Sequence, residues 1–204
     1  MIKKILYTFF IIAFIILAVL ITGGVLAYKA LGGAGKKYSV TELKKNFEKK
    51  SSQIYELIDY FETIAPQNRF VEIEFKNKNT INRFGAQESD TTNKAIFLEW
   101  DLKINSAKSD SLMASVGWNR ETLKQLKTKL DAAHCIGIES GEPINIKFQR
   151  SGLGMYSFNV FRLALSEDER EHYNDSCRYI LVNDKLALEY GGGAVGPQCF
   201  PNLK

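Results

Sequence analysis

The chain contains two histidines and three cysteines, residue types that often bind zinc or act in catalysis. A zinc site needs three or four converging ligands, usually in pairs with a short spacing. The adjacent residues His134 and Cys135 point in different directions in a helix or a strand, and no C-x-x-C or H-x-x-x-H pair is present. The sequence therefore predicts no metal site, and no motif in it indicates a cofactor.

A nucleophilic hydrolase would need a serine or cysteine that the fold brings beside a histidine. No local motif of such an enzyme surrounds Ser140, Cys135 or Cys177. We predict that Cys135 is a small buried side chain beside a helix. A hydrolase whose site is assembled only by the fold, with His134 or His172, stays an alternative.

Two pairs of carboxylates, Glu72 with Glu74 and Glu99 with Asp101, stand two residues apart on expected strands. Such residues share a face and can come within the distance that glycosidases use for their acid and nucleophile. The same pairs are typical of the water-facing side of an antiparallel strand. We favour solvated carboxylates, and keep the carboxylates as a second version of the hydrolase alternative.

Glycines lie close together near the C-terminus, from Gly191 to Gly196. This run lacks the Gly-Lys-Ser/Thr end of a phosphate loop, and Pro197 follows where a helix should begin. The sequence therefore predicts no nucleotide site there. The run can instead bend the chain so that Cys199 reaches Cys177.

We predict a disulfide between Cys177 and Cys199, with Cys135 left as a free buried thiol. The bond would close a loop of about 22 residues and add roughly 3 kcal/mol of stability in the chain-entropy model. It would also hold the tail as an exposed contact loop. The candidate contact residues are Tyr190, Gly191, Gly192, Gly193, Ala194, Val195, Gly196, Pro197, Gln198 and Phe200.

Residues Ile5 to Tyr28 carry no charged side chain, and as a helix they would extend about 36 Å, more than the roughly 30 Å of a bilayer core. We predict a transmembrane anchor over residues 1–30 that is retained in the mature protein. A cleaved signal peptide is the alternative, since Val25 to Ala27 offers small residues at a suitable spacing.

Two features of the sequence make opposite predictions for the orientation of this anchor. Lysines after the apolar run outnumber Lys3 and Lys4 before it, which favours a cytoplasmic domain. A short basic stub before a long apolar run is nevertheless typical of an export signal, and long domains cross largely regardless of charge. We predict a single-pass membrane protein with an extracytoplasmic C-terminal domain. A membrane-bound cytoplasmic regulator with three reduced thiols is the alternative.

The charge of the chain excludes a nucleic-acid-binding body. The net charge is +4, but the first 37 residues hold five lysines and no acidic residue, which leaves 22 basic and 23 acidic residues beyond them. A near-neutral remainder lacks the basic face that phosphate groups require. The basic character therefore belongs to the N-terminal end.

After a glycine-rich linker over residues 31–37, residues 38–204 are expected to form one domain. A capping box at Ser39 and Glu42 begins a helix that stops before Pro66. A second helix runs from Arg120 to Ala133 after Asn119, and a short third helix begins at Ser166 and reaches about Asn174. The apolar stripe of the first helix is Val40, Leu43, Phe47, Ile54, Leu57, Ile58, Phe61 and Ile64, with Leu57 and Phe61 expected to be deeply buried.

A two-residue alternation of apolar and polar side chains marks half-buried strands. They are expected at Val71–Phe75, Ile96–Ile104, Ile144–Gln149, Met155–Leu165, Arg178–Val182 and Lys185–Tyr190. No regular strand–helix repeat is present, as a parallel sheet would need. The fold class is therefore α+β: a transmembrane helix, then one domain with an antiparallel sheet packed by two main helices and one short helix.

An anchor, a flexible linker, one domain and no recognisable catalytic set favour a membrane-tethered binding module of the cell envelope. Its expected partners are the lipid bilayer and either another envelope protein or a small ligand, with no nucleic acid. The sequence does not identify that ligand. Enzymatic activity is the less favoured interpretation.

Overall fold

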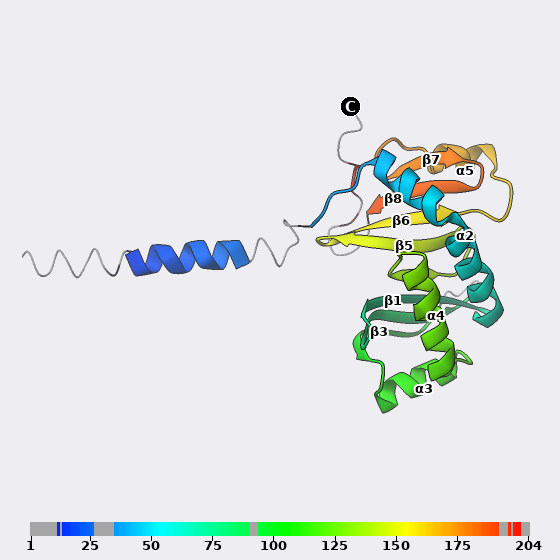
Figure 1. Cartoon of the computed structure of the whole chain (residues 1–204), viewed down its shortest axis with the longest axis horizontal. Coiled ribbons are helices and arrows are strands. Elements are labelled where there is room, and N and C mark those ends of the chain that lie inside the picture. The colour runs from blue at the N-terminus through cyan, green and yellow to red at the C-terminus, as the bar shows by residue number, and fades with distance from the viewer. Residues whose placement is uncertain are drawn as a thin grey trace, which may run out of the picture.

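The computed structural model describes residues 12, 14–26, 35–89, 94–191, 196 and 198–200. Residues 14–26 are helical and form the dark blue helix in Figure 1, and their large apolar side chains are exposed. Among the described residues, no helix is both long enough and apolar enough to span a membrane. The predicted crossing helix over Ile5–Tyr28 is therefore not confirmed, and its two ends lie outside the described residues.

From residue 35 onward the chain forms one antiparallel sheet with several helices, so the α+β class is confirmed (Figure 1). The strand order is β3-β2-β1-β4-β5-β6-β8-β7. The strands are β1 (Arg69–Asn77), β2 (Thr80–Glu88), β3 (Ala95–Lys103), β4 (Gly137–Glu139), β5 (Ile144–Ser151), β6 (Gly154–Val160), β7 (Tyr179–Asn183) and β8 (Leu186–Gly191). The helices are α2 (Val40–Ile64), α3 (Ala107–Ser115), α4 (Arg120–Ala132) and α5 (Glu167–His172).

The two long helices begin where their caps predict. The Ser39 hydroxyl accepts a hydrogen bond from the Glu42 N–H, and the Glu42 carboxylate accepts one from the Ser39 N–H. Helix α4 begins after Asn119, whose side chain accepts from the Thr122 N–H. The prediction for α2 is confirmed, because Phe61 is 1% exposed and Leu57 is fully buried.

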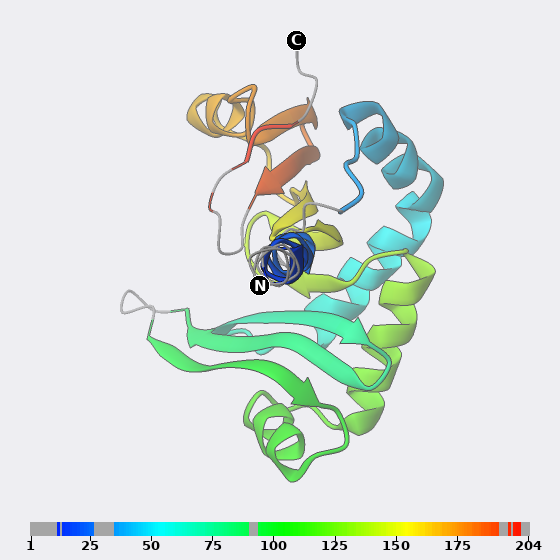
Figure 2. The ribbon, with the colours of Figure 1, turned by 90° about the vertical axis from the view of Figure 1, so that its left-hand side faces the viewer.

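Both helices lie along one side of the sheet, on the right in Figure 2. Their apolar stripes meet the strands in a core rich in aromatic rings. Trp118 stacks on Phe84 with 5.7 Å between ring centroids, and its indole N–H donates to the Ile64 carbonyl oxygen at 2.8 Å. This hydrogen bond satisfies a buried donor and ties the end of α2 to the segment before α4.

Strand β3 departs from the expected burial. In a half-buried strand the apolar set should face the core, yet Leu98 and Trp100 are exposed, whereas Phe97 packs on Phe84 with 4.9 Å between ring centroids. The β1–β2 register shifts between Glu74 and Phe75, and Asp101 has a positive φ of 48°. Such irregularities re-aim the side chains of a strand. The expectation that one face of this strand is uniformly buried is therefore wrong.

Three elements were not predicted. Strand β2 contains Gly85 and consecutive polar residues instead of a clear alternation, and β4 has only three residues. Helix α3 buries only Ser109 and Met113. None of the three carries a strong periodic pattern, and each is held by its neighbours in the fold.

Candidate functional site

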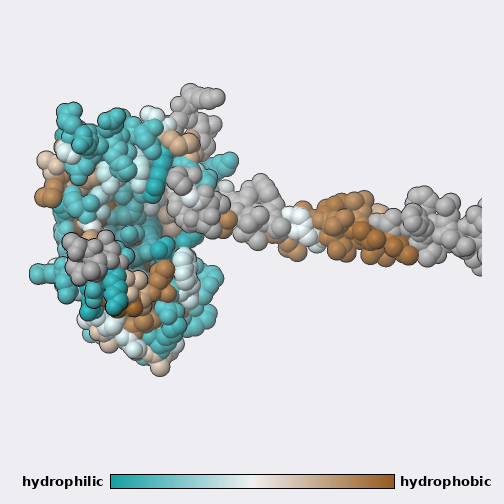
Figure 3. All heavy atoms as spheres, turned by 180° about the vertical axis from the view of Figure 1, so that it is seen from behind, coloured by the Kyte–Doolittle hydropathy of each residue, from teal (hydrophilic) through white to brown (hydrophobic). Residues whose placement is uncertain are grey.

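The face of the sheet opposite α2 and α4, which we call the open face, is hollowed and lined by charged side chains. A cavity of about 570 Å³ lies over its middle strands. Figure 3 views the molecule from the side opposite that of Figure 1 and shows largely hydrophilic surface there. We define the polar groove by ten lining residues: Glu72, Glu74, Arg83, Glu139, Asn145, Lys147, Arg150, Asn159, Arg178 and Glu189.

Lys147 of β5 lies at the centre of the polar groove and is 7% exposed. Its ammonium contacts the Glu72 carboxylate and lies 3.6 Å from a Glu139 carboxylate oxygen. In the β4–β5 strand pair, Lys147 lies opposite Gly137 of β4. A Cβ atom added at Gly137 would lie 2.5 Å from the Ile73 carbonyl oxygen and 3.2 Å from Lys147 Cδ. A glycine is required there, because a side chain would collide with the backbone of β1.

Burial perturbs two titratable groups at this centre, Lys147 and Glu139. Burial lowers the pKa of the Lys147 ammonium to about 7, and the nearby Arg150 acts in the same direction, whereas Glu189 raises it. Contact with the Glu72 carboxylate favours the charged lysine and opposes the shift. Burial also raises the pKa of the Glu139 carboxyl above its ordinary value. The pKa values of the lysine and of the Glu139 carboxyl are therefore closer to each other than in water.

A second ion pair joins Glu74 of β1 to Arg150 of β5. The guanidinium donates two hydrogen bonds to the carboxylate, at 2.5 and 2.6 Å, and the Asn82 amide donates a third at 2.9 Å. Arg150 reaches the open face because the β5–β6 register shifts between Lys147 and Gln149. Glu74 is only 2% exposed, so the expectation that its carboxylate is solvated is wrong.

A third cluster surrounds Glu189 of β8. Its carboxylate accepts hydrogen bonds from Arg178 at 2.5 and 3.0 Å. The side-chain amides of Asn145 and Asn159 each donate to its other oxygen at 3.0 Å. Four partners, from β5, β6, the start of β7 and the residue just before it, therefore hold this carboxylate in one orientation, counting the Tyr179 hydroxyl at 3.4 Å.

Arg83 of β2 lies where the polar groove meets a second cavity of about 710 Å³. Its guanidinium carbon lies 5.0 Å from the centre of the Trp100 ring, and its Nε lies 3.0 Å from a Glu72 carboxylate oxygen. That Nε is buried and makes no hydrogen bond of good geometry. The two cavities also share Glu72, Glu139 and Pro143, so they form one continuous depression.

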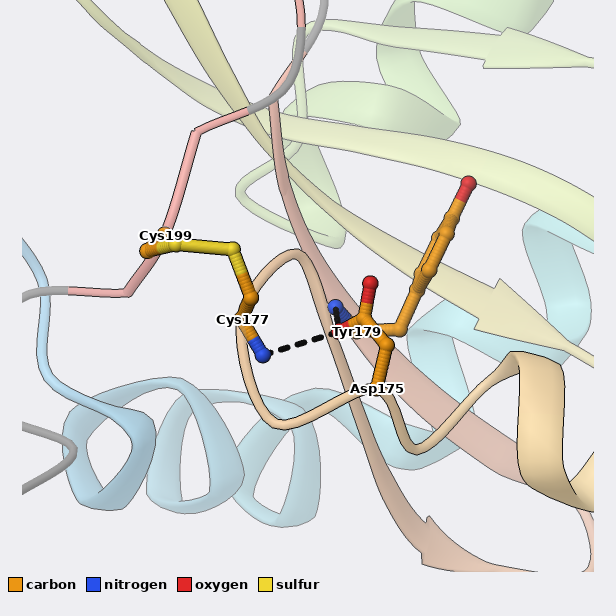
Figure 4. The surroundings of a disulfide bond; sticks show 4 residues. All are labelled: Asp175, Cys177, Tyr179 and Cys199. Carbon is orange, nitrogen blue, oxygen red and sulfur yellow. Dashed lines mark hydrogen bonds between the residues drawn. A yellow bond between two sulfur atoms is a disulfide. The ribbon is translucent and has the colours of Figure 1, made fainter.

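The predicted disulfide between Cys177 and Cys199 is confirmed, and Cys135 is a free buried thiol as expected (Figure 4). The Asp175 carboxylate accepts from the N–H groups of Cys177 and Tyr179, both at 2.8 Å, and so shapes the turn that presents Cys177. The Phe200 N–H donates to the Cys177 carbonyl oxygen at 2.9 Å. The tail is therefore fastened to the start of β7.

The predicted contact loop is only partly described. Tyr190 and Phe200 are buried, with 5.9 Å between their ring centroids, so these two side chains do not form a surface. Gly191 is buried and Gln198 half-buried. Residues 192–195 and 197 lie outside the described residues, and the contact loop as a whole stays a prediction.

The other candidate residues are scattered. His134 follows α4 and His172 ends α5, and both are exposed. Glu99 pairs with Lys108 at 2.6 Å, whereas Asp101 pairs with Lys76 at 2.7 Å. Within the described part of the chain, no group of three or more His, Cys, Asp or Glu is arranged to hold a metal ion.

Most of the polar groove was missed by sequence reasoning, which named only Glu72 and Glu74 of its ten residues. The available indication was that Asn145 and Lys147, and likewise Ser157 and Asn159, occupy the polar positions of strands otherwise rich in apolar residues. Comparison of the chain with family models, with curated proteins and with solved structures finds no significant match. The geometry therefore carries the functional argument alone.

Proposed function

We propose that the chain is a membrane-tethered binding module of the cell envelope, and that the polar groove binds its ligand. The observation that carries this proposal is the burial of charged groups around an open cavity. Glu74 and Lys147 are 2% and 7% exposed, and desolvating such groups is costly even when they are paired. A protein with well-packed apolar side chains in place of a buried ion pair is often equally stable or more stable. The charged set is therefore better explained by recognition of a ligand than by support of the fold.

The composition of the groove indicates a polar ligand. Carboxylates, guanidinium groups and side-chain amides offer both acceptors and donors around one cavity, and Trp100 and Tyr179 add aromatic surface at its border. The positive and negative groups are equal in number among the ten residues. A ligand with both donors and acceptors, either a small molecule or a segment of another envelope protein, suits this balance.

The membrane tether is the second part of the proposal. The described large apolar side chains from Ile12 to Leu26 are between 49% and 73% exposed, as suits contact with lipid. The disulfide suits an oxidising compartment and hence an extracytoplasmic domain. A wash at high salt should leave the protein in the membrane fraction. N-terminal sequencing that begins near Tyr28 would instead show a cleaved signal, and full alkylation of three thiols in the native host would favour the cytoplasmic regulator.

Binding in the groove can be tested by photocrosslinking in the native host. A photoreactive phenylalanine analogue replaces Leu153, which lines the polar groove, and in a control variant replaces Lys124, which is exposed on α4. We expect a discrete adduct from position 153 and none from position 124. Added Arg178→Gln should reduce that adduct, because it removes the cation that holds Glu189. Equal adducts from both positions would contradict the proposal.

An envelope hydrolase stays the second candidate, because one observation favours it. Burial raises the pKa of the Glu139 carboxyl and lowers that of Lys147 to about 7, which suits one group as general acid and the other as general base. Glu139→Gln would then abolish turnover of a bound ligand while leaving its binding intact. Loss of binding without any turnover in the unmodified protein would support the binding module instead.

A further inference from the structure

The two edges of the sheet differ in length and chemistry. At one end β7 has five residues, of which Tyr179 is buried and the middle three are half-buried. At the other end β3 has nine residues, and no described strand pairs with its outer side. Unpaired backbone groups along a long edge are a template for another strand.

The side chains of β3 do not protect this edge on the open face. Leu98 and Trp100, paired with Gly85 and Arg83 of β2, are 48% and 54% exposed, and Ile96, at the register shift between Ala95 and Phe97, is 38% exposed. Figure 3 shows a hydrophobic patch in the lower half of the same face, where Figure 1 places β3. Exposed edge strands are usually interrupted by charge, proline, a bulge or a short length. On its open face β3 has no charge or proline from Ile96 to Trp100, and its register shift with β2 falls near its beginning, at Ile96.

We propose that β3 pairs with β3 of a second copy of this chain. The two strands would run antiparallel about a two-fold axis, so that the two sheets join into one continuous sheet. The same apolar residues would meet across the axis, and both polar grooves would open on the same side. Trp100 also lines the polar groove and Leu98 lines the adjoining cavity, so the pairing would take place at the rim of that depression.

The apolar and charged side chains of β3 favour one register for this β3–β3 pairing. With the axis at Leu98, Leu98 faces its own copy and Ile96 faces Trp100, so all three exposed apolar side chains find apolar partners. On the other face Phe97 then lies opposite Glu99, and no like charges oppose each other. An axis at Glu99 would place two glutamates face to face, which is destabilising.

A shift of the axis in the other direction leaves one exposed apolar side chain without an apolar partner. With the axis at Phe97, Trp100 would lie opposite Lys94 instead of an apolar side chain. The axis at Leu98 is therefore the register in which the edge is complementary to itself. This self-complementarity favours a second copy over an unrelated strand, because a two-fold axis makes each contact twice.

Cysteine crosslinking of the full chain in detergent tests this register. Leu98→Cys should form a covalent dimer on mild oxidation, since its Cβ would lie about 5 Å from its copy. Ile96→Cys is the matched control, because its copy would lie four strand positions away, roughly 13 Å. A mixture of Ile96→Cys and Trp100→Cys chains should again give a dimer, a result that only this register predicts.

The reversible dimer is measured separately by sedimentation of the same full chain. Leu98→Lys should raise the dissociation constant at least tenfold without changing the circular dichroism spectrum. A folded Leu98→Cys protein that forms no covalent dimer would overturn the proposal, as would efficient crosslinking of Ile96→Cys alone. An unchanged dissociation constant for Leu98→Lys, or crosslinking of Leu98→Cys only to foreign proteins in host membranes, would overturn it as well.

Discussion

The face of the sheet beneath α2 and α4 is lined by apolar side chains such as Ile73, Phe84 and Ile146, whereas the open face buries Glu74 and Lys147 to nearly the same extent. Apolar burial gains free energy from every atom removed from water. Burial of a charged group costs desolvation free energy, and it stabilises the fold only if the attraction to its partner exceeds that cost. The two faces of one sheet therefore differ in what they bury: the covered face supplies stability, and the open face holds the charged set on which the proposed ligand binding rests.

The largest expected effect comes from a cavity on the covered face. Phe61→Ala removes a ring that is 1% exposed and packs against Trp118, with 6.1 Å between ring centroids. Its free energy of unfolding should fall by about 3 to 5 kcal/mol in chemical denaturation. Glu56→Ala, on the exposed side of α2, is the control and should change it by less than about 0.5 kcal/mol. A loss below roughly 1 kcal/mol for Phe61→Ala would mean that α2 is not core.

On the open face, Arg150→Ala leaves the Glu74 carboxylate buried with only the Asn82 amide. We expect a loss of about 3 kcal/mol, because an uncompensated charge stays in the groove. Replacing both partners together, Glu74→Leu with Arg150→Met, should recover most of that loss while reducing ligand binding. A double variant as unstable as the single one would show that the pair itself holds the fold, and would remove the contrast between the faces.

The disulfide tests a region that belongs to the covered face, since Phe200 packs on Tyr156 with 5.9 Å between ring centroids. The bond spans 22 residues, so its reduction should cost about 3 kcal/mol in the chain-entropy model. Thermal unfolding with and without reductant measures this loss. The Cys199→Ser variant should already unfold at the lower temperature and show no further change with reductant. A reductant effect in that variant would assign the loss to another cause.

The smallest expected effect is the response of the open face to pH. Burial lowers the pKa of Lys147 to about 7, from an ordinary value near 10.5, so above pH 7 the unfolded chain binds a proton that the folded chain has released. This group therefore makes stability rise between pH 7 and pH 9, and that contribution is lost as the pH falls toward 7. Lys147→Met should flatten the rise. If the native protein instead loses stability relative to the variant as the pH rises from 7 to 9, the ion pair with Glu72 outweighs the effect of burial on Lys147.

The covered face could be predicted well from sequence, because its information is local. The capping box at Ser39 and the apolar spacing through Phe61 specify α2, and Asn119 specifies the start of α4. The confirmed disulfide followed from the few cysteines and a flexible glycine run before Cys199. In each case a short stretch of chain contains the physical cause of the structure.

The open face could not be predicted in the same way, because its information lies in pairs of distant residues. Glu74 and Arg150 are 76 positions apart, and Arg150 reaches the face only through a register shift in β5. The exposed side of β3 likewise depends on a bulge between β1 and β2 and on the positive φ of Asp101. Alternation in a single strand predicts that one face is apolar and the other polar. Bulges, however, decide which side chains point to which face of the sheet.

Cys135 has a consequence for how the disulfide forms. Its thiol is buried shortly after the end of α4, and burial raises its pKa to about 12. At neutral pH the folded protein therefore holds almost none of the thiolate that attacks another sulfur. A chain that packs this segment first withdraws the odd cysteine from exchange before oxidation begins. In such a chain the thiols of Cys177 and Cys199 are the pair left to combine, with Cys135 held apart from both.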